Sequence, residues 1–452
     1  MYPFPTFFLR LIVIFIAIVV TVLINHNQLC AQDIPIQRIE IPSSWNPVGS
    51  GARALGVGGA FIAIADDATA ASWNPGGLIQ LETPEVSIVG AYFNRTEDLT
   101  FGNNEEASGE QDFSNANLNY LSAAYPFSLF DRNMILSLNY QYLYDLTREW
   151  NFPFKLEDAD ISASGSVHIE QDGGLSAIGL AYCIQVTPQF SFGLTLNYWG
   201  DGLTENGWEQ KEKQSVSGSD AGMTFNYMLD QIDKYSFNGF NANLGFLWNI
   251  NNRLSIGGVL KTPFTADLNQ KSTSNISINF PDEPDYNNDV STSSDDDLKI
   301  DMPMSYGIGI AYRFSDQLTT SFDIYRTEWD DFILTDADGN KISPISGKSE
   351  SEADIDPTTQ IRLGAEYLIL ANRFIVPVRG GAFYDPAPAE GSPDEIYGIS
   401  MGSGIAMGKV VFDIAYQYRF GNGIGKYIQE SDDFSMDLRE YTVYGSLIYH
   451  FQ

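Results

Sequence analysis

The stretch "QFSFGLTLNYW", Gln189–Trp199, alternates apolar residues with small or polar ones along its whole length. Successive side chains of a β-strand point to opposite faces, so a period of two predicts a strand with one apolar face and one small or polar face. The apolar face carries Phe190, Phe192, Leu194, Leu196 and Tyr198, and the other face carries Ser191, Gly193, Thr195 and Asn197. The same alternation returns in residues 134–144, 304–314, 361–369 and 410–420. The chain is therefore predicted to be all-β.

Fourteen strands are predicted from residue 84 onward, and the connections between them alternate in length. The strands are placed at 84–94, 119–127, 133–144, 175–185, 189–199, 240–250, 253–262, 304–314, 317–328, 358–369, 373–384, 395–406, 409–419 and 440–451. Short connections such as "VTPQ" and "NN" follow every second strand, whereas the others are mostly long and polar, the longest being 145–174, 200–239 and 263–303. Residues 271–280 are an alternative hairpin arm within the last of these. A soluble sandwich has no reason to separate loop lengths in this way, whereas an outer-membrane barrel does.

The strands suit a membrane better than an aqueous core. They run for about ten residues with aromatic residues near the ends of their apolar faces, as in a transmembrane barrel with lipid outside, a polar lumen and aromatic girdles at both interfaces. The chain holds 24 Tyr and 29 Phe, and its last strand carries Tyr449 and Phe451. We therefore predict a transmembrane antiparallel β-barrel of about 14 strands in the outer membrane of a Gram-negative-type bacterium.

The N-terminus indicates export. An apolar run, "LIVIFIAIVVTVLI", occupies residues 11–24 and is followed by a polar stretch and Ala31. Its length favours a signal peptide over residues 1–31 with cleavage near Ala31, and a transmembrane anchor is the alternative. Residues 32–83 would then form a separate N-terminal segment before a barrel of residues 84–452. Cys30 and Cys183 are the only cysteines, so the mature chain is expected to lack an intrachain disulfide.

Charge and composition exclude several functions. The net charge of −33 argues against nucleic-acid binding and against docking on an anionic membrane surface. Three histidines, without a recognisable partner or metal-ligand cluster, do not support an enzyme. The segment "DADGN", Asp336–Asn340, holds a fragment of calcium-loop spacing but lacks the distal glutamate, so neither a metal nor a cofactor is predicted.

The segment "GSGARALGVGGAFIAIADDATAASWNPGGL", residues 49–78, breaks the strand pattern and resembles the N-terminal hatch of FadL-type outer-membrane transporters. Residues 302–332, 361–388 and 410–421 resemble later segments of the same family. The resemblance implies a fourteen-stranded barrel plugged by the hatch and surrounded by outer-membrane lipid and lipopolysaccharide. It implies passive transport of long-chain fatty acids or other hydrophobic small molecules, captured outside and released sideways through a gap in the barrel wall after the hatch moves. It implies no energy source or cofactor.

The hatch supplies the candidate site residues. We expect Asn74, Pro75 and Gly76 to act as the gate, with Asp66 or Asp67 capping a short helix, Pro75 ending it, and Gly76 and Gly77 allowing a tight return. The hatch is expected to be weakly held. Its apolar residues are candidate ligand contacts, and hatch packing is the alternative for each of them. They are Phe61, Ile62, Ile64, Trp73 and Leu78.

Three other functions compete with hydrophobic transport. A barrel with this hatch signature can be a docking or assembly partner in protein secretion, with the acidic loops as its partner surface. A general porin needs an open aqueous lumen, which a hatch would block. A barrel enzyme is disfavoured by the scarcity of histidine. The expected state is a monomer.

Overall fold

The computed structural model describes residue 41 and residues 44–102, 104–157, 161–200, 206–220, 222–428 and 433–451. The predicted signal peptide, residues 1–31, and residues 32–40, 42 and 43 of the predicted N-terminal segment lie outside the described residues. Among the described residues, no helix has both the length and the apolar character needed to span a membrane.

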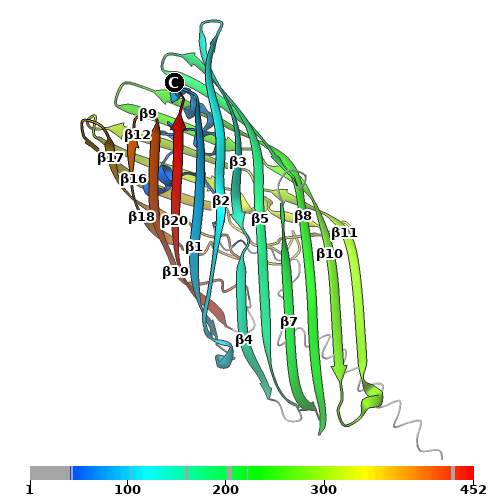
Figure 1. Cartoon of the computed structure of the whole chain (residues 1–452). Helices are drawn as coiled ribbons and strands as arrows, with labels where there is room; N and C mark the ends of the chain where they lie inside the picture. The colour runs from blue at the N-terminus through cyan, green and yellow to red at the C-terminus, as the bar shows by residue number, and fades with distance from the viewer. Residues whose placement is uncertain are drawn as a thin grey trace, which may run out of the picture.

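Fourteen strands close into an antiparallel ring, as predicted (Figure 1). The ring strands are β1 (Glu85–Phe101), β2 (Gly109–Leu129), β3 (Arg132–Asp145), β5 (Ile161–Thr187), β6 (Phe190–Trp199), β8 (Met223–Asn249), β9 (Leu254–Lys261), β12 (Ser305–Arg313), β13 (Leu318–Thr327), β16 (Thr358–Leu370), β17 (Ile375–Tyr384), β18 (Tyr397–Met407), β19 (Val410–Ile424) and β20 (Phe434–His450). The pairing of β1 with β20, from Glu85↔His450 to Phe101↔Phe434, closes the ring. One end of the barrel carries the short turns, and the other carries the long connections.

The long connections are largely β-structure, so the prediction of loops at 145–174, 200–239 and 263–303 is wrong. Further strands continue the ring beyond the barrel: β4 (Arg148–Glu157), β7 (Gly207–Asp220), β10 (Phe264–Asn279), β11 (Asn288–Met302), β14 (Ile333–Thr335) and β15 (Lys341–Ile342). We call β4, β7, β10 and β11, with residues 161–174 of β5 and 223–237 of β8, the extension. It projects from one side of the ring in Figure 1. The alternative hairpin arm at 271–280 is confirmed, since it falls almost entirely within β10.

Two of the breaks between a ring strand and its continuation coincide with proline. Pro263 separates β9 from β10, and Pro303 lies between β11 and β12. Proline has no N–H to donate to a β-ladder, so it ends or offsets a strand. After Pro263 the strand nevertheless resumes against the same neighbour on one side, because β8 pairs with both β9 and β10.

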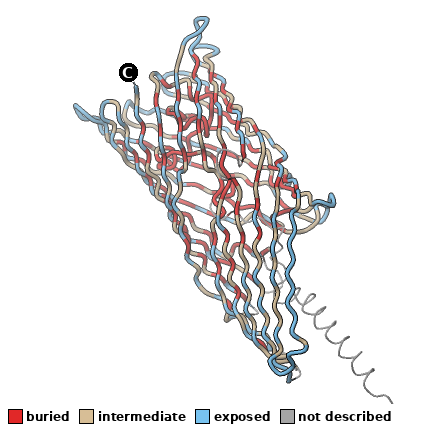
Figure 2. Tube along the Cα trace, turned by 45° about the vertical axis from the view of Figure 1, so that its right-hand side comes forward, coloured by how far each residue is buried: buried red, intermediate tan, exposed pale blue. Residues whose placement is uncertain are grey.

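The outward face of the ring is apolar and the inward face is small and polar, as predicted. On β6 the outward Phe192 and Tyr198 are 43% and 44% exposed, whereas the inward Ser191 and Thr195 are 2% and 0% exposed. In Figure 2 the buried positions concentrate inside the barrel, and the far end of the extension is pale blue and tan. An exposed apolar outer face is what a barrel presents to lipid.

The hatch fills the lumen near the short-turn end. Its elements are α2 (Ala52–Gly56), α3 (Ala70–Trp73) and the 3₁₀ helix η1 (Pro75–Gln80); the other 3₁₀ helices are η2 (Glu105–Ala107), η3 (Pro284–Tyr286) and η4 (Trp329–Asp331). Wall side chains on six ring strands bond to hatch backbone or accept from it: Tyr120, Ser191, Thr195, Asp323, Arg362, Ser400 and Gln417. The hatch thus bonds to strands on several sides of the ring, and the expectation that it is weakly held stays a prediction.

A second apolar cluster, which we call the outer core, fills the interior toward the long-connection end. It combines aromatic and aliphatic residues of the ring, the extension and the long connections, including Trp45, Trp150, Trp199, Trp208, Phe237, Trp329, Phe332 and Phe434. Trp45, which precedes the hatch, meets Trp329 edge to face with ring centroids 5.4 Å apart. The lumen therefore has an apolar interior that strand alternation alone does not reveal.

Candidate functional site

The triplet Asn74-Pro75-Gly76 joins the hatch to the barrel wall. The Asn74 side-chain amide donates to the carbonyl oxygens of Ile62 in the hatch and Phe246 in β8, at 2.8 Å each. Its Oδ1 accepts the Gly76 N–H at 3.0 Å, at the start of η1. Asn74 is fully buried, and leaving a buried polar group unpaired costs about 1–3 kcal/mol. The triplet therefore anchors the hatch, and its role as a gate stays a prediction.

Glycines on the inner wall allow the triplet to sit directly on the barrel. A Cβ on Gly193 of β6 would lie 2.2 Å from the carbonyl carbon of Pro75, and one on Gly245 of β8 would lie 2.2 Å from Asn74 Oδ1. Real Cβ atoms do not approach other atoms so closely, so any larger residue would displace the hatch or the strand.

Gly76 and Gly77 let neighbouring backbone approach the hatch closely, and they do not form a tight turn of the chain. Neither has a positive φ, so the conformational freedom of glycine is not what these positions need. A Cβ on Gly76 would lie 2.6 Å from the Cα of Phe246, and one on Gly77 would lie 2.3 Å from the Ala65 carbonyl oxygen. The expectation of a glycine turn here is corrected on this ground.

The expectation that Asp66 or Asp67 caps the helix before the triplet is wrong, because the N-cap residue of α3 is Thr69 and no side chain makes a capping hydrogen bond there. Asp67 accepts the backbone N–H of Thr69 at 2.9 Å, immediately before α3, whereas Asp66 pairs with Arg53 at 2.7 Å. Asn74 is extended at φ −152°, as expected for a residue before proline, and α3 ends at Trp73.

The five apolar candidates pack inside the hatch and against the barrel wall. Phe61, Ile62, Trp73 and Leu78 are at most 2% exposed, and Ile64 packs against the same cluster of hatch and wall residues. The Trp73 indole N–H donates to the Ser50 carbonyl at 2.6 Å. None of the five lines either of the cavities described next. Their role as ligand contacts stays a prediction.

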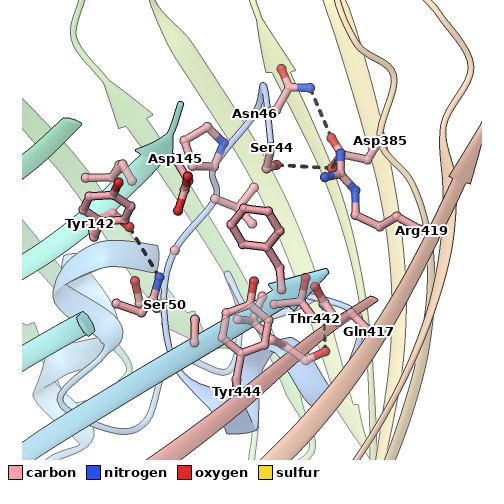
Figure 3. A pocket seen from close by; sticks show the side chains of 18 of the residues that line it. Ser44, Asn46, Ser50, Tyr142, Asp145, Asp385, Gln417, Arg419, Thr442 and Tyr444 are labelled. Atoms are coloured by element: carbon pink, nitrogen blue, oxygen red, sulfur yellow. Dashed lines mark hydrogen bonds and ion pairs between the residues drawn. The ribbon is translucent and has the colours of Figure 1, made fainter. Parts of the chain in front are cut away.

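A cavity of about 100 Å³ lies between the segment before the hatch and the wall (Figure 3). Residues 44–50 form one side, and residues of β1, β2, β3, β16, β17, β19 and β20, with Asp385 after β17, form the other. Its lining is rich in polar and charged groups, among them Asn46, Asn117, Asn119, Gln141, Tyr142, Asp145, Arg362, Asp385, Gln417, Arg419, Glu440 and Tyr444. A smaller cavity of about 20 Å³ lies nearby, between Arg148 and Arg419 and outer-core residues such as Trp45 and Ile428.

A ladder of buried ion pairs crosses the wall of these cavities. In order it runs Arg148, Glu97, Arg95, Glu440, Arg419, Asp385 and Arg362, with N–O separations between 2.7 and 3.5 Å. Every member is at most 7% exposed. Buried charges of this kind are tolerated only when paired, and removing one partner typically costs about 3–5 kcal/mol. Four arginines against three carboxylates leave the seven residues with one excess positive charge.

Asn46 ties the segment before the hatch to the end of this ladder. Its amide donates to Asp385 Oδ1 at 3.1 Å, and its Oδ1 accepts from the Trp329 indole at 2.8 Å and from the Thr358 hydroxyl at 2.7 Å. It thus connects the polar cavity to the outer core. No local feature of the sequence marks Asn46 as such a link, because its partners lie hundreds of residues away.

The barrel wall has a seam beside the cavity. The ladder between β2 and β3 ends at Tyr120↔Gln141. Beyond that point, among the described residues, residues 109–119 of β2 pair only with β1, and β3 and β4 pair only with β5. The ring is therefore not joined there by backbone hydrogen bonds.

Asparagine side chains bridge this seam. Asn115 and Asn117 of β2 both donate to Asp145 Oδ2 of β3, at 3.1 and 3.0 Å. Leu118, between Asn117 and Asn119, points outward and is 42% exposed. The seam thus has the polar cavity on its inner side and an apolar residue on its outer side.

The remaining sequence candidates have structural partners. The Asp336 carboxylate accepts the backbone N–H groups of Asp338 and Asn340 at 2.9 and 2.8 Å, so it closes its own turn. His450 Nδ1 lies 3.1 Å from Glu85 Oε2, where β20 meets β1.

Comparisons with known proteins agree with this architecture. Solved structures with a similar fold include a Pseudomonas aeruginosa FadL homologue, with TM-score 0.59, 13% identity and coverage of 89% of this chain and 99% of that one. The Pseudomonas putida toluene transporter TodX has TM-score 0.55, 12% identity and coverage of 90% and 100%. The Ralstonia pickettii toluene transporter TbuX has TM-score 0.53, 14% identity and coverage of 90% and 100%. No sequence among the curated proteins matches this chain.

The match to a sequence family covers most of the chain. Residues 47–421 match the family described as outer membrane protein transport protein (OMPP1/FadL/TodX). That range includes the hatch, the cavity segment from Pro47 onward and twelve of the fourteen ring strands in full. The chain therefore belongs to the OMPP1/FadL/TodX family of outer-membrane transport proteins, whose members are channels rather than enzymes.

Proposed function

We propose that this protein is a passive channel that carries long-chain fatty acids or other hydrophobic small molecules across the outer membrane. The observation that carries the proposal is a continuous series of three features: the outer core, the polar cavity beneath it and the seam beside that cavity. In this proposal the long-connection end faces outward, in the surrounding lipid and lipopolysaccharide, after export by the predicted signal at residues 1–31.

Capture begins at the outer core. Apolar cargo gains roughly 25 cal/mol for each Å² of apolar surface removed from water, and clustered aromatic rings offer such a surface. Trp45 and Trp329 both belong to this cluster and contact each other. Trp45 lies in the segment that leads to the hatch. Binding there would draw cargo toward the cavity.

Release runs sideways through the seam between β2 and β3. Unpaired backbone groups cost several kcal/mol each in lipid, so a gap in a barrel wall needs side chains to cover it. Asn115, Asn117 and Asp145 make such a cover, and side chains can swing aside more easily than a backbone ladder can open. The apolar bilayer then receives the cargo directly.

The described conformation is closed. In other proteins an apolar cavity of roughly 150 Å³ accepts one benzene molecule, so a polar cavity of about 100 Å³ does not hold an acyl chain. Passage of a long-chain fatty acid therefore requires the hatch, or residues 44–50 before it, to move.

The test locks the seam. In a Cys183→Ala background, Asn117→Cys with Asp145→Cys places two thiols across the seam, where a disulfide would hold β2 to β3. We expect this variant to lose uptake of labelled oleate or labelled toluene in cells without another such channel, and to regain it on reduction.

The matched control is Ser122→Cys with Asn139→Cys, which joins the same two strands where their ladder is already paired. It should transport normally whether oxidised or reduced. Equal uptake by oxidised and reduced seam variants would contradict lateral release through this seam.

A docking role in protein secretion is the second candidate, and the exposed acidic end of the extension favours it. If a secreted protein co-purifies with this chain and cells that carry it take up no hydrophobic compound, the docking role is supported and the transport proposal is wrong.

A further inference from the structure

The outermost strand of the extension has an unpaired edge. Residues 288–302 of β11 pair with β10 at every position along one side. On its other side β11 pairs only through Lys299, Ile300 and Asp301, with β14. Among the described residues, residues 288–298 therefore present backbone N–H and C=O groups to no neighbouring strand. Such an edge is a ready template for a further strand.

Both faces of this edge are open to solvent. Residues 288–295 and 297 of β11 are exposed, Asp296 is half-buried, and the strand first enters the interior at Leu298. The exposed part of β11 has small or β-branched side chains, which suit a pleated strand. They are Val290, Ser291, Thr292, Ser293 and Ser294. A chain that added to this edge would meet no protein surface above or below it.

The edge is strongly acidic. From residue 282 to residue 301 the acidic residues are Asp282, Glu283, Asp285, Asp289, Asp295, Asp296, Asp297 and Asp301, and the only basic residue is Lys299. Asp289, Asp295 and Asp297 share one face, because they are separated by even numbers of positions. Asn269 of β10 donates to Asp295 at 2.8 Å and to Asp297 at 3.1 Å, which holds these two carboxylates side by side. Lys271 of β10 lies 3.6 Å from Asp295 in an exposed ion pair, so the other carboxylates carry most of the unbalanced charge.

We propose that the free edge of β11 binds, by strand addition, an extended basic segment of a partner protein. A second copy of this chain is a poor occupant, because pairing two β11 edges would bring like charges opposite each other. The fitting segment carries Lys or Arg at alternate positions, so that its cations lie on the face of Asp289, Asp295 and Asp297. Main-chain hydrogen bonds supply the attachment, and the charge pattern selects the partner.

The experiment uses the full chain in lipid nanodiscs and a ten-residue peptide of alternating Thr and Lys with blocked ends. Fluorescence anisotropy at low ionic strength measures its binding. We expect saturable binding that weakens as salt is added. The variant Asp295→Asn/Asp296→Asn/Asp297→Asn should weaken it about tenfold or more, equivalent to about 1.4 kcal/mol.

Two controls separate strand addition from general attraction to acid. The variant Asp282→Asn/Glu283→Gln/Asp285→Asn removes the same charge from the adjoining turn and should change the affinity far less. Two further peptides are N-methylated at alternate residues, so that each loses the N–H groups along one of its two edges and keeps every cation. We expect the peptide whose pairing edge is blocked not to bind. Equal losses in both variants, equal binding of all peptides, or association of the channel with itself through β11 would each overturn the proposal.

Discussion

A single methyl group decides whether the hatch can sit against the wall at Gly193. The motif around Asn74 could be picked out from the sequence, because it interrupts a regular strand pattern. Its acceptor on β8, the Phe246 carbonyl, could not, because no local signal connects residues so far apart in the chain. The inward-facing Gly193 was visible in the strand alternation, yet only the folded structure shows what it accommodates.

Gly193→Ala should displace the hatch while leaving the ring intact, since the added Cβ would overlap Pro75. We expect faster proteolysis of the hatch and greater entry of a large antibiotic into cells. Gly445→Ala is the matched control, because a Cβ on this β20 glycine has nothing within 4 Å. If both variants behave alike, close packing at Gly193 does not hold the hatch.

Strand prediction succeeded where one face of an element meets lipid and failed where neither does. The ring strands were found because apolar and small residues alternate on β6 and its counterparts. The end of β11 has no such period, since both of its faces are exposed and selection for an apolar face is absent. Its run of Ser, Thr and Asp therefore has the composition of a solvated loop. The ladder from Arg148 to Arg362 was missed for a different reason: its members come from several strands, and no one strand shows the pattern.

The connection after β17 should loosen as pH rises. Burial raises the pKa of Asp394 to about 6, while the Gly425 N–H that it accepts at 2.8 Å opposes the shift. A carboxyl group with a raised pKa in the folded state binds its proton more tightly there than in the unfolded chain. Its stabilising contribution is thus complete below its ordinary pKa of 3.8 and is lost as pH rises through about 6.

Hydrogen exchange measures this effect. After correction for intrinsic rates, the amides of Ala387 and Gly425 should open more often at pH 7 than at pH 5. Asp394→Asn should remove the difference, because the amide keeps an acceptor oxygen and cannot titrate. An unchanged pH dependence in that variant would assign the effect to another group.

At the scale of the whole molecule, the ring and the extension are separable. The ring closes through β9 and β12, which pair directly with each other and do not depend on β10 or β11. The extension shares strands with the ring yet carries its exposed surface far from the hatch and the cavity (Figures 1 and 2). Transport and partner binding would therefore occupy different parts of one sheet.

Removing residues 272–294 and joining the shortened β10 and β11 by an Asn-Gly turn should leave a folded, transporting barrel. Heat-dependent mobility on gels and cargo uptake measure this. Deleting residues 305–327 removes the same number of residues but takes out ring strands β12 and β13, and it should abolish both. Failure of the first variant to assemble would show that the extension is needed for folding.

The bonds that surround the hatch also bear on the order of assembly. Donors and acceptors on β2, β6, β13, β16 and β19 all meet the hatch backbone, so a hatch entering a finished cylinder would find every one of them already committed to water or to one another. The strands are therefore expected to assemble around the hatch while the ring is still open. The pairing of β20 with β1 would then be the final step. A chain that stalls before that step would keep its N-terminal segment open to proteases, and the appearance of hatch protection in a pulse-chase experiment would mark the moment of closure.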